Sequence, residues 1–140
     1  MLTAMADQPY FDQSGEPSDE PGQFVRVDDL APLHMLDGLE FRPVTTESVM
    51  TNFVTFAPDA PAPMHHHVEQ QIAIVLSGEL IFTVGEETRT MRAGDCVVIP
   101  SHVPHGGDSG PDGCTVLDVF SPPRAAIVGL MGAGDGVSGS

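Results

Sequence analysis

Proline and glycine divide this sequence into short segments, and their spacing limits the possible folds more than any other feature. The chain has 140 residues, of which 13 are proline and 15 are glycine. Between them lie short runs that are apolar or alternating, such as 49–56, 79–84 and 114–120, and rich in residues that favour strands. No long segment has a helical period. Short strands separated by proline and glycine turns predict an all-β sandwich or barrel.

The same reading predicts where the strands and turns lie. Strands are expected at 24–27 (a first edge strand), 39–44, 49–56, 72–76, 79–84, 88–92, 96–99 and 114–120. Turns or loops are expected at 28–32, 77–78, 85–87, 93–95, 103–107 and 108–113. The prolines of 58–63 forbid helix and hold the chain extended ahead of a histidine-rich stretch.

The ends of the chain differ from its middle. Residues 1–24 are acidic, contain no basic residue and carry three prolines, which predicts a flexible segment. Tyr10 and Phe11 are the residues there that can dock on the domain or on a partner subunit. We expect one domain at 25–124, then a glycine-rich tail at 125–140 in which 125–131 forms a short helix or packs on the rim.

The charge of the chain argues against two classes of partner. The formal net charge is −15, and the five basic residues include no lysine. Nucleic acids and anionic membrane surfaces both require a basic face, so neither is an expected partner. An anionic small molecule remains compatible, because a buried cation reverses the local field.

Two further features concern the compartment. The first residues lack the basic start and apolar core of a signal peptide, and no apolar run approaches membrane-spanning length, so the expected location is the cytoplasm. Cys96 and Cys114 each lie in an apolar run without CxxC spacing, which predicts two reduced thiols in the core.

The stretch 64–71 contains half of the six histidines and leads directly into an apolar run. In an extended strand, His65 and His67 share a face while His66 points away. Gln71 and Glu69 both have the same parity, so an amide oxygen or a carboxylate can join the two imidazoles as a metal ligand. His105, which follows a buried strand and a proline loop, is the best candidate for a further ligand.

The spacing of these residues resembles that of the cupin family. His65-x-His67-x3-Gln71-x6-Gly78 is similar to the first cupin motif, with glutamine where glutamate is usual. Gly94-x5-Pro100-x4-His105 is similar to the second motif, with His102 in place of a usual glycine. The strand pattern extends this resemblance over about residues 24–124.

The resemblance implies a small jelly-roll-like barrel, the double-stranded β-helix, which is usually a homodimer. It also implies one divalent metal ion (zinc, nickel, iron or manganese) held by His65, His67, Gln71 and His105. Only Gln71 lies at the family's distance from Gly78, which favours it over Glu69. His66 and His102 are then expected at the rim or surface.

A metal held by neutral ligands keeps its full charge and favours an anionic or enolisable substrate oxygen. Asp118 lies in an apolar strand, where an ionised carboxylate is costly unless it is paired or used, so it is the candidate general acid/base. Phe120 shares its parity and is a candidate substrate wall, and Arg124 is a candidate clamp for a carboxylate. The alternatives are an Asp118 paired with backbone or arginine, a core Phe120 and a surface Arg124.

Two segments narrow the resemblance further. Gln71-Ile72-x-x-Val75-Leu76-x-Gly78-Glu79-Leu80 and 118–124 (DVFSPPR) resemble small single-domain cupins that process unsaturated uronates, and the ligand pattern also resembles zinc-dependent cupin polyketide cyclases. Both imply a metal-dependent lyase, isomerase or cyclase acting on a small oxygen-rich metabolite. The alternatives are an iron- or nickel-dependent dioxygenase and a small-molecule-binding or sensing cupin without turnover.

Overall fold

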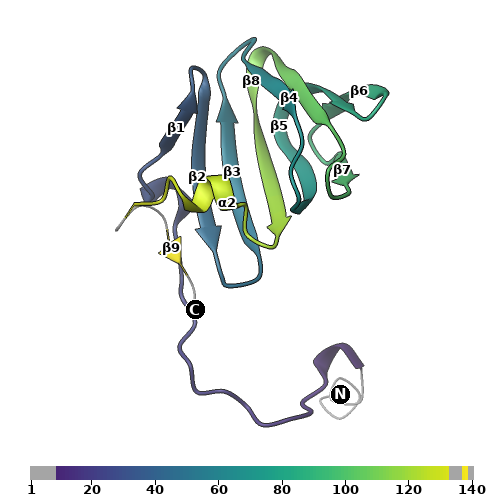
Figure 1. Cartoon of the computed structure of the whole chain (residues 1–140). Helices are drawn as coiled ribbons and strands as arrows, with labels where there is room; N and C mark the ends of the chain where they lie inside the picture. The colour runs from purple at the N-terminus through teal and green to yellow at the C-terminus, as the bar shows by residue number, and fades with distance from the viewer. Residues whose placement is uncertain (1–8, 133–136, 139–140) are drawn as a thin grey trace.

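Two long strands, β5 (Gln70–Val84) and β8 (His105–Ser121), organise the fold. The computed structural model describes residues 9–132 and 137–138, and in it these strands run antiparallel and pair along most of their length (Figure 1). The first half of β5 pairs with the second half of β8, and the reverse holds for their other halves. Each long strand therefore contributes to both faces of a sheet that folds over on itself.

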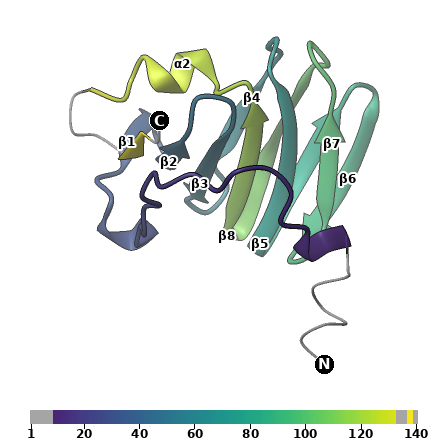
Figure 2. The same ribbon diagram turned by 90° about the horizontal axis from the view of Figure 1, so that it is seen from below.

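The other strands extend this pair on both sides (Figure 2). In one layer, β1 (Leu33–Leu36), β2 (Leu39–Thr45) and β3 (Met50–Phe56) follow the second half of β8, and β7 (Cys96–Ile99) pairs with the first half of β5 on the far side of the pair. In the other layer, β4 (Pro61–His65) pairs with the first half of β8 and β6 (Glu87–Arg92) with the second half of β5. The short strand β9 (Val137–Ser138) pairs in parallel with β2. The prediction of an all-β double-stranded β-helix is confirmed.

The core lies between the two layers and follows from strand alternation. In β3, residues 50, 52, 54 and 56 are buried while the residues between them are partly or fully exposed. Val75, Leu80 and Val116 from the long strands join Val54 in the main cluster of buried hydrophobic side chains. Asn52 shares the inward parity of that strand although it is polar, and it is almost completely buried.

Gly78 lies at a corner inside β5, where the sequence predicts a turn between two strands. The chain does not reverse there; the pairing with β8 shifts register on both sides of Gly78 instead. The φ angle of Gly78 is +74°, and a Cβ atom would lie 2.2 Å from the carbonyl oxygen of Gly113. The predicted turn is therefore wrong, and the glycine instead permits the close approach of two strands.

We expect Gly78→Ala to destabilise the fold by about 2–5 kcal/mol, because it combines left-handed strain with overlap against backbone. Gly94→Ala is the matched control, since Gly94 has φ +93° but nothing within 4 Å of its Cβ position. Urea unfolding of both variants measures the difference. Equal losses in the two proteins would contradict the close approach at Gly78.

Several other predictions are also wrong. The loop and turn expected at 103–107 and 108–113 belong to β8 from His105 onward. Their glycines are needed for packing, since a Cβ at Gly107 would lie 2.3 Å from the Ile81 oxygen. No strand forms at 24–27, where a 3-10 helix (Val27–Asp29) begins, and the first strand is β1, which the sequence reading missed. Cys96 is exposed, so only Cys114 is a core thiol.

The described residues near the termini contain little regular structure. A 3-10 helix spans Pro9–Phe11, and residues 12–23 are exposed and lack regular structure. The short helix α2 (Ala125–Val128) follows β8, as predicted. The predictions for 1–8, 133–136 and 139–140 lie outside the described residues. Within the described part, no helix is long and apolar enough to cross a membrane.

Candidate metal centre

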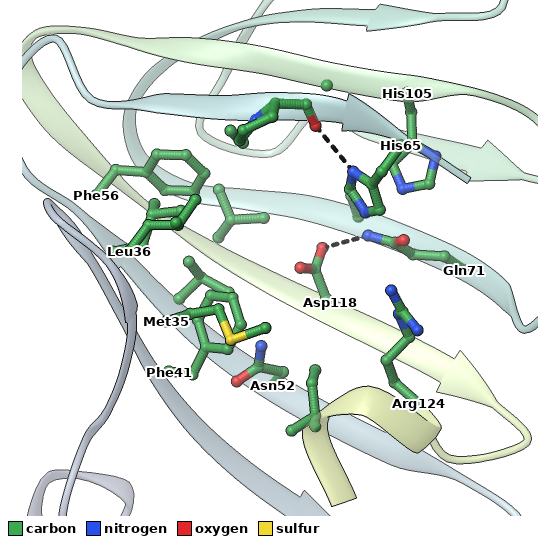
Figure 3. A pocket seen from close by; sticks show the side chains of 18 of the residues that line it. Met35, Leu36, Phe41, Asn52, Phe56, His65, Gln71, His105, Asp118 and Arg124 are labelled. Atoms are coloured by element: carbon green, nitrogen blue, oxygen red, sulfur yellow. Dashed lines mark hydrogen bonds between the residues drawn. The ribbon is translucent and has the colours of Figure 1, made fainter. Parts of the chain in front are cut away.

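Three histidines, from β4, from the segment that follows it and from β8, meet beside a cavity. Figure 3 shows two of them, His65 and His105. His65 ends β4, His67 follows two residues later, and His105 begins β8. The pairing of β4 with β8 sets His65 opposite His105. One ring nitrogen of each histidine lies within 4.8 Å of those of the other two, so the three imidazoles can meet at one ion.

The backbone fixes how each ring presents its nitrogens. The Nδ1 atoms of His65, His67 and His105 lie 2.9, 3.0 and 2.9 Å from the carbonyl oxygens of Pro63, Glu69 and Val103. A carbonyl oxygen only accepts, so each Nδ1 carries the hydrogen and donates it. Each neutral ring therefore keeps its Nε2 lone pair, which is the arrangement that metal-ligating histidines require.

Two observations test whether this donor set fits a metal ion. The Nε2 atom of His105 is buried and has no hydrogen-bond partner among the residues that the structure describes. The Nε2 atom of His67 lies 3.1 Å from Oε1 of Gln71, whose amide nitrogen donates to Asp118. Two atoms that both present lone pairs at this distance repel each other unless a cation lies beside both. The residues therefore fit a divalent metal.

Burial favours the neutral form of His67 and of His105. Loss of solvation lowers the pKa of His105 to about 4, and the neighbouring histidines and Arg124 act in the same direction. Burial, followed by the charge of Arg124, also lowers the pKa of His67. Neutral imidazoles are the form that binds metals.

Glu69 lies beside the Nδ1 edge of the His67 ring, whereas the other two histidines lie on the Nε2 side. Its Oε1 is 3.5 Å from Nδ1 of His67 and 3.7 Å from the Arg124 guanidinium, and its Oε2 accepts a hydrogen bond from the backbone of Ala125. Burial acts to raise the pKa of Glu69, but the Ala125 hydrogen bond and the Arg124 charge prevail and lower it. This geometry favours Gln71 over Glu69 as the residue beside the three rings, and it gives Glu69 the role of linking His67 to α2.

Asp118, Phe120 and Arg124 all line the cavity, whose volume is about 350 Å³. The partner of Asp118 is the Gln71 amide, whose nitrogen donates to Oδ1 at 2.9 Å. Burial raises the pKa of Asp118 to about 7, against the opposing effect of that hydrogen bond. Phe120 packs edge-on against His67, with ring centroids 5.7 Å apart. The carboxyl group thus faces the cavity at the end where the histidines gather.

His66 and His102 lie apart from this cluster and are exposed, with their Nδ1 atoms 3.2 Å from each other. His102 has a positive φ of 64°, and its backbone N–H donates to the carbonyl oxygen of His67. His102 therefore stands where a glycine would be easiest, and its backbone supports the loop that carries a candidate ligand.

The sequence reading missed three residues of the cavity. Met35 and Leu36 lie on strand β1, which was not predicted, and they line the apolar end of the cavity. Asn52 also lines it, and its Oδ1 atom is buried without a partner. A signal for Asn52 was present, because it is the polar residue at an inward position of an alternating strand. No comparable signal existed for β1.

Comparison with known proteins agrees with this geometry. The family described as "Cupin domain" matches residues 52–120. The pectin degradation protein KdgF of Dickeya dadantii is 32% identical over 102 residues, which cover 71% of this chain and 93% of that protein. A Bacillus subtilis protein called H2HPP isomerase is 45% identical over 56 residues, which cover 39% of this chain and 24% of that protein.

A solved structure, that of KdgF from a Halomonas species, superimposes with a TM-score of 0.72 at 27% identity and covers 76% of this chain and 99% of the other. Four observations indicate the same family. They are the fold, the spacing of the two histidine motifs, the convergence of three imidazoles and a relative that is matched over nearly its whole length. The chain belongs to the cupin family, as a small cupin that resembles the uronate-processing members.

Proposed function

We propose that this protein is a metal-dependent enzyme that isomerises, opens or cyclises a small molecule through a carbonyl or enol group. The observation that carries this proposal is the convergence of three Nε2 lone pairs and the Gln71 oxygen beside a cavity that Asp118 faces. A divalent ion held by His65, His67, His105 and Gln71 would supply Lewis-acid polarisation of a substrate oxygen. Zinc, nickel, iron and manganese are the candidate ions.

In this proposal the side chains of the cavity divide the work. Arg124 binds an anionic oxygen of the substrate, because its guanidinium lines the cavity and keeps its position through Glu69. Asp118 moves a proton to or from the carbon next to the polarised group, since its carboxyl group faces the cavity. The bond from Gln71 keeps that carboxyl group oriented, and Phe120 supports His67 and closes one wall.

This proposal allows two classes of substrate. One is an unsaturated uronate, by similarity to KdgF, and the other is a larger enolisable molecule of the kind on which polyketide cyclases act. Proton NMR in D₂O can follow ring opening of unsaturated galacturonate and deuterium uptake at the methylene carbon of phenylpyruvate, with a dioxygen electrode in parallel. We expect acceleration of at least one reaction without dioxygen use, loss after chelation and recovery with added metal. Stoichiometric consumption of dioxygen would contradict the proposal and favour a dioxygenase.

We also propose that the protein is a homodimer formed through the outer face of β5, β7 and β8. Register sets Ile72 beside Val98 and Val119, and Ile72 and Val98 are 40% and 66% exposed. A hydrophobic sheet face of this kind is usually covered by a partner. Light scattering after size exclusion should give the mass of two chains for the wild type and for Val128→Asp, and of one chain for Val98→Asp. A monomeric wild type would contradict the proposal.

A further inference from the structure

The polar side chains that line the cavity beside the histidines gather at one end, apart from Asn52. Its polar lining side chains are those of Asn52, His65, Gln71, His105, Asp118 and Arg124, and apart from Gly106 every other lining residue is hydrophobic. Figure 3 shows His65, His105, Gln71 and Arg124 on one side and Phe56, Leu36, Met35 and Phe41 on the other. The lining therefore has a chemically reactive head end and a hydrophobic body end.

Most of the polar groups at the head end already contact another protein side chain or are candidate metal ligands. Gln71 donates a hydrogen bond to Asp118, and the Arg124 guanidinium faces the carboxylate of Glu69. A sugar acid bound here would use its carboxylate and one oxygen at this end, and its remaining hydroxyl groups would face side chains such as Phe41 and Phe56. A hydroxyl buried without a partner is costly, so this lining disfavours a polyhydroxylated body.

Asn52 is the exception in the body of the cavity. It lies on β3 directly opposite Asp118 in register, and β2 on its other side supplies Phe41. Its side chain is 1% exposed, and its Oδ1 atom has no hydrogen-bond partner. A buried oxygen of this kind needs a donor. Asn52 thus places one polar side chain in the body of the cavity, near Asp118, where a bound molecule can pair with at most one polar group.

We propose that the cavity takes a hydrophobic acid rather than a sugar acid. Such a molecule has one anionic or enolisable head at the histidine end, a hydrocarbon body against Phe41 and Met35, and at most one polar group along that body, beside Asn52. This inference rests on the proposed function for the head end and specifies the substrate class of the same site. Aromatic and alicyclic 2-oxo acids are members of the class.

Isothermal titration of the metal-containing protein with three acids of equal charge distinguishes a site for a hydrophobic acid from a site for a sugar acid. Pyruvate presents the head alone, phenylpyruvate adds an aromatic body, and galacturonate carries a hydroxylated body. We expect phenylpyruvate to bind at least about tenfold more tightly than either of the others, from burial of its ring. Equal affinities, tighter binding of galacturonate, or no detectable binding of phenylpyruvate would overturn the proposal.

Two variants locate the effect in the body end. Phe41→Ala removes a wall of the cavity, and Met35→Gln adds polar groups at a residue that is 41% exposed and so tolerates the change. Each should weaken phenylpyruvate binding several-fold and leave pyruvate binding unchanged. Met64→Gln is the matched control, because Met64 is 54% exposed and does not line the cavity. Equal losses for both ligands in Met35→Gln would place the ring elsewhere and contradict the proposal.

The two proposals fail in different ways. Metal content measured on the same samples tests the proposed function, since a protein that binds no metal removes its basis whichever acid binds best. A protein that holds metal but prefers galacturonate retains the proposed function and refutes the hydrophobic acid.

Discussion

Replacing Asp118 with asparagine is expected to lower the catalysed rate by about 10²–10⁴-fold, the usual contribution of a positioned acid or base. The amide cannot exchange a proton with substrate, whereas its oxygen can still accept the hydrogen bond from Gln71. The fold and the metal content should therefore be unchanged. Deuterium uptake by phenylpyruvate and ring opening of unsaturated galacturonate, followed by NMR, provide the measurement.

Asp108→Asn is the matched control for this experiment. Asp108 is on the same strand, but it is exposed and does not line the cavity. Its replacement should leave the rate at the wild-type value. A fully active Asp118→Asn protein would show that Asp118 has a structural role through Gln71 and that another group moves the proton.

The second large effect concerns His105. We expect His105→Ala to weaken metal binding by at least about 100-fold, because losing only the hydrogen-bond partner of a ligand already costs 10–100-fold. Among the described residues, the buried Nε2 atom of His105 has no hydrogen-bond partner, so a metal ligand is the role left for it. Competition with a chelator of known affinity, read by metal analysis, measures the change.

His66→Ala is the control for His105→Ala. His66 lies between two candidate ligands in sequence, yet it is exposed and turned toward His102. Its loss should leave metal affinity unchanged. Circular dichroism of both variants separates loss of metal from loss of fold. Equal metal binding by wild type and His105→Ala would remove His105 from the site.

Much of the fold could be predicted because local patterns agree with it. The alternation of 49–56 and the apolar run of 72–76 each encode one buried face, and both form strands as expected. The turns that were predicted wrongly lie at glycines. Gly78, Gly106 and Gly107 indicate turns locally, but their lack of a side chain serves close contact with strands distant in sequence. No local pattern records such contacts.

The candidate site was predicted to a similar extent. Strand parity separates His65 and His67 from His66, and the structure gathers the first two with His105 and sets Asp118 beside Gln71. The contact of Glu69 with Arg124 and the cavity position of Asn52 depend on the packing of α2 and β3, which the sequence does not specify. The hydrophobic end of the cavity needs β1, whose four residues carry a weak strand signal.

X-ray absorption spectroscopy of the purified protein, combined with metal analysis, tests the central claim most directly. We expect one divalent metal per chain, bound by three imidazole nitrogens and an oxygen donor. The same spectrum of Gln71→Ala should lose the contribution of the amide oxygen and retain the three imidazoles. A protein without stoichiometric metal after growth in metal-supplemented medium, or a metal bound by fewer than three imidazoles, would contradict the account.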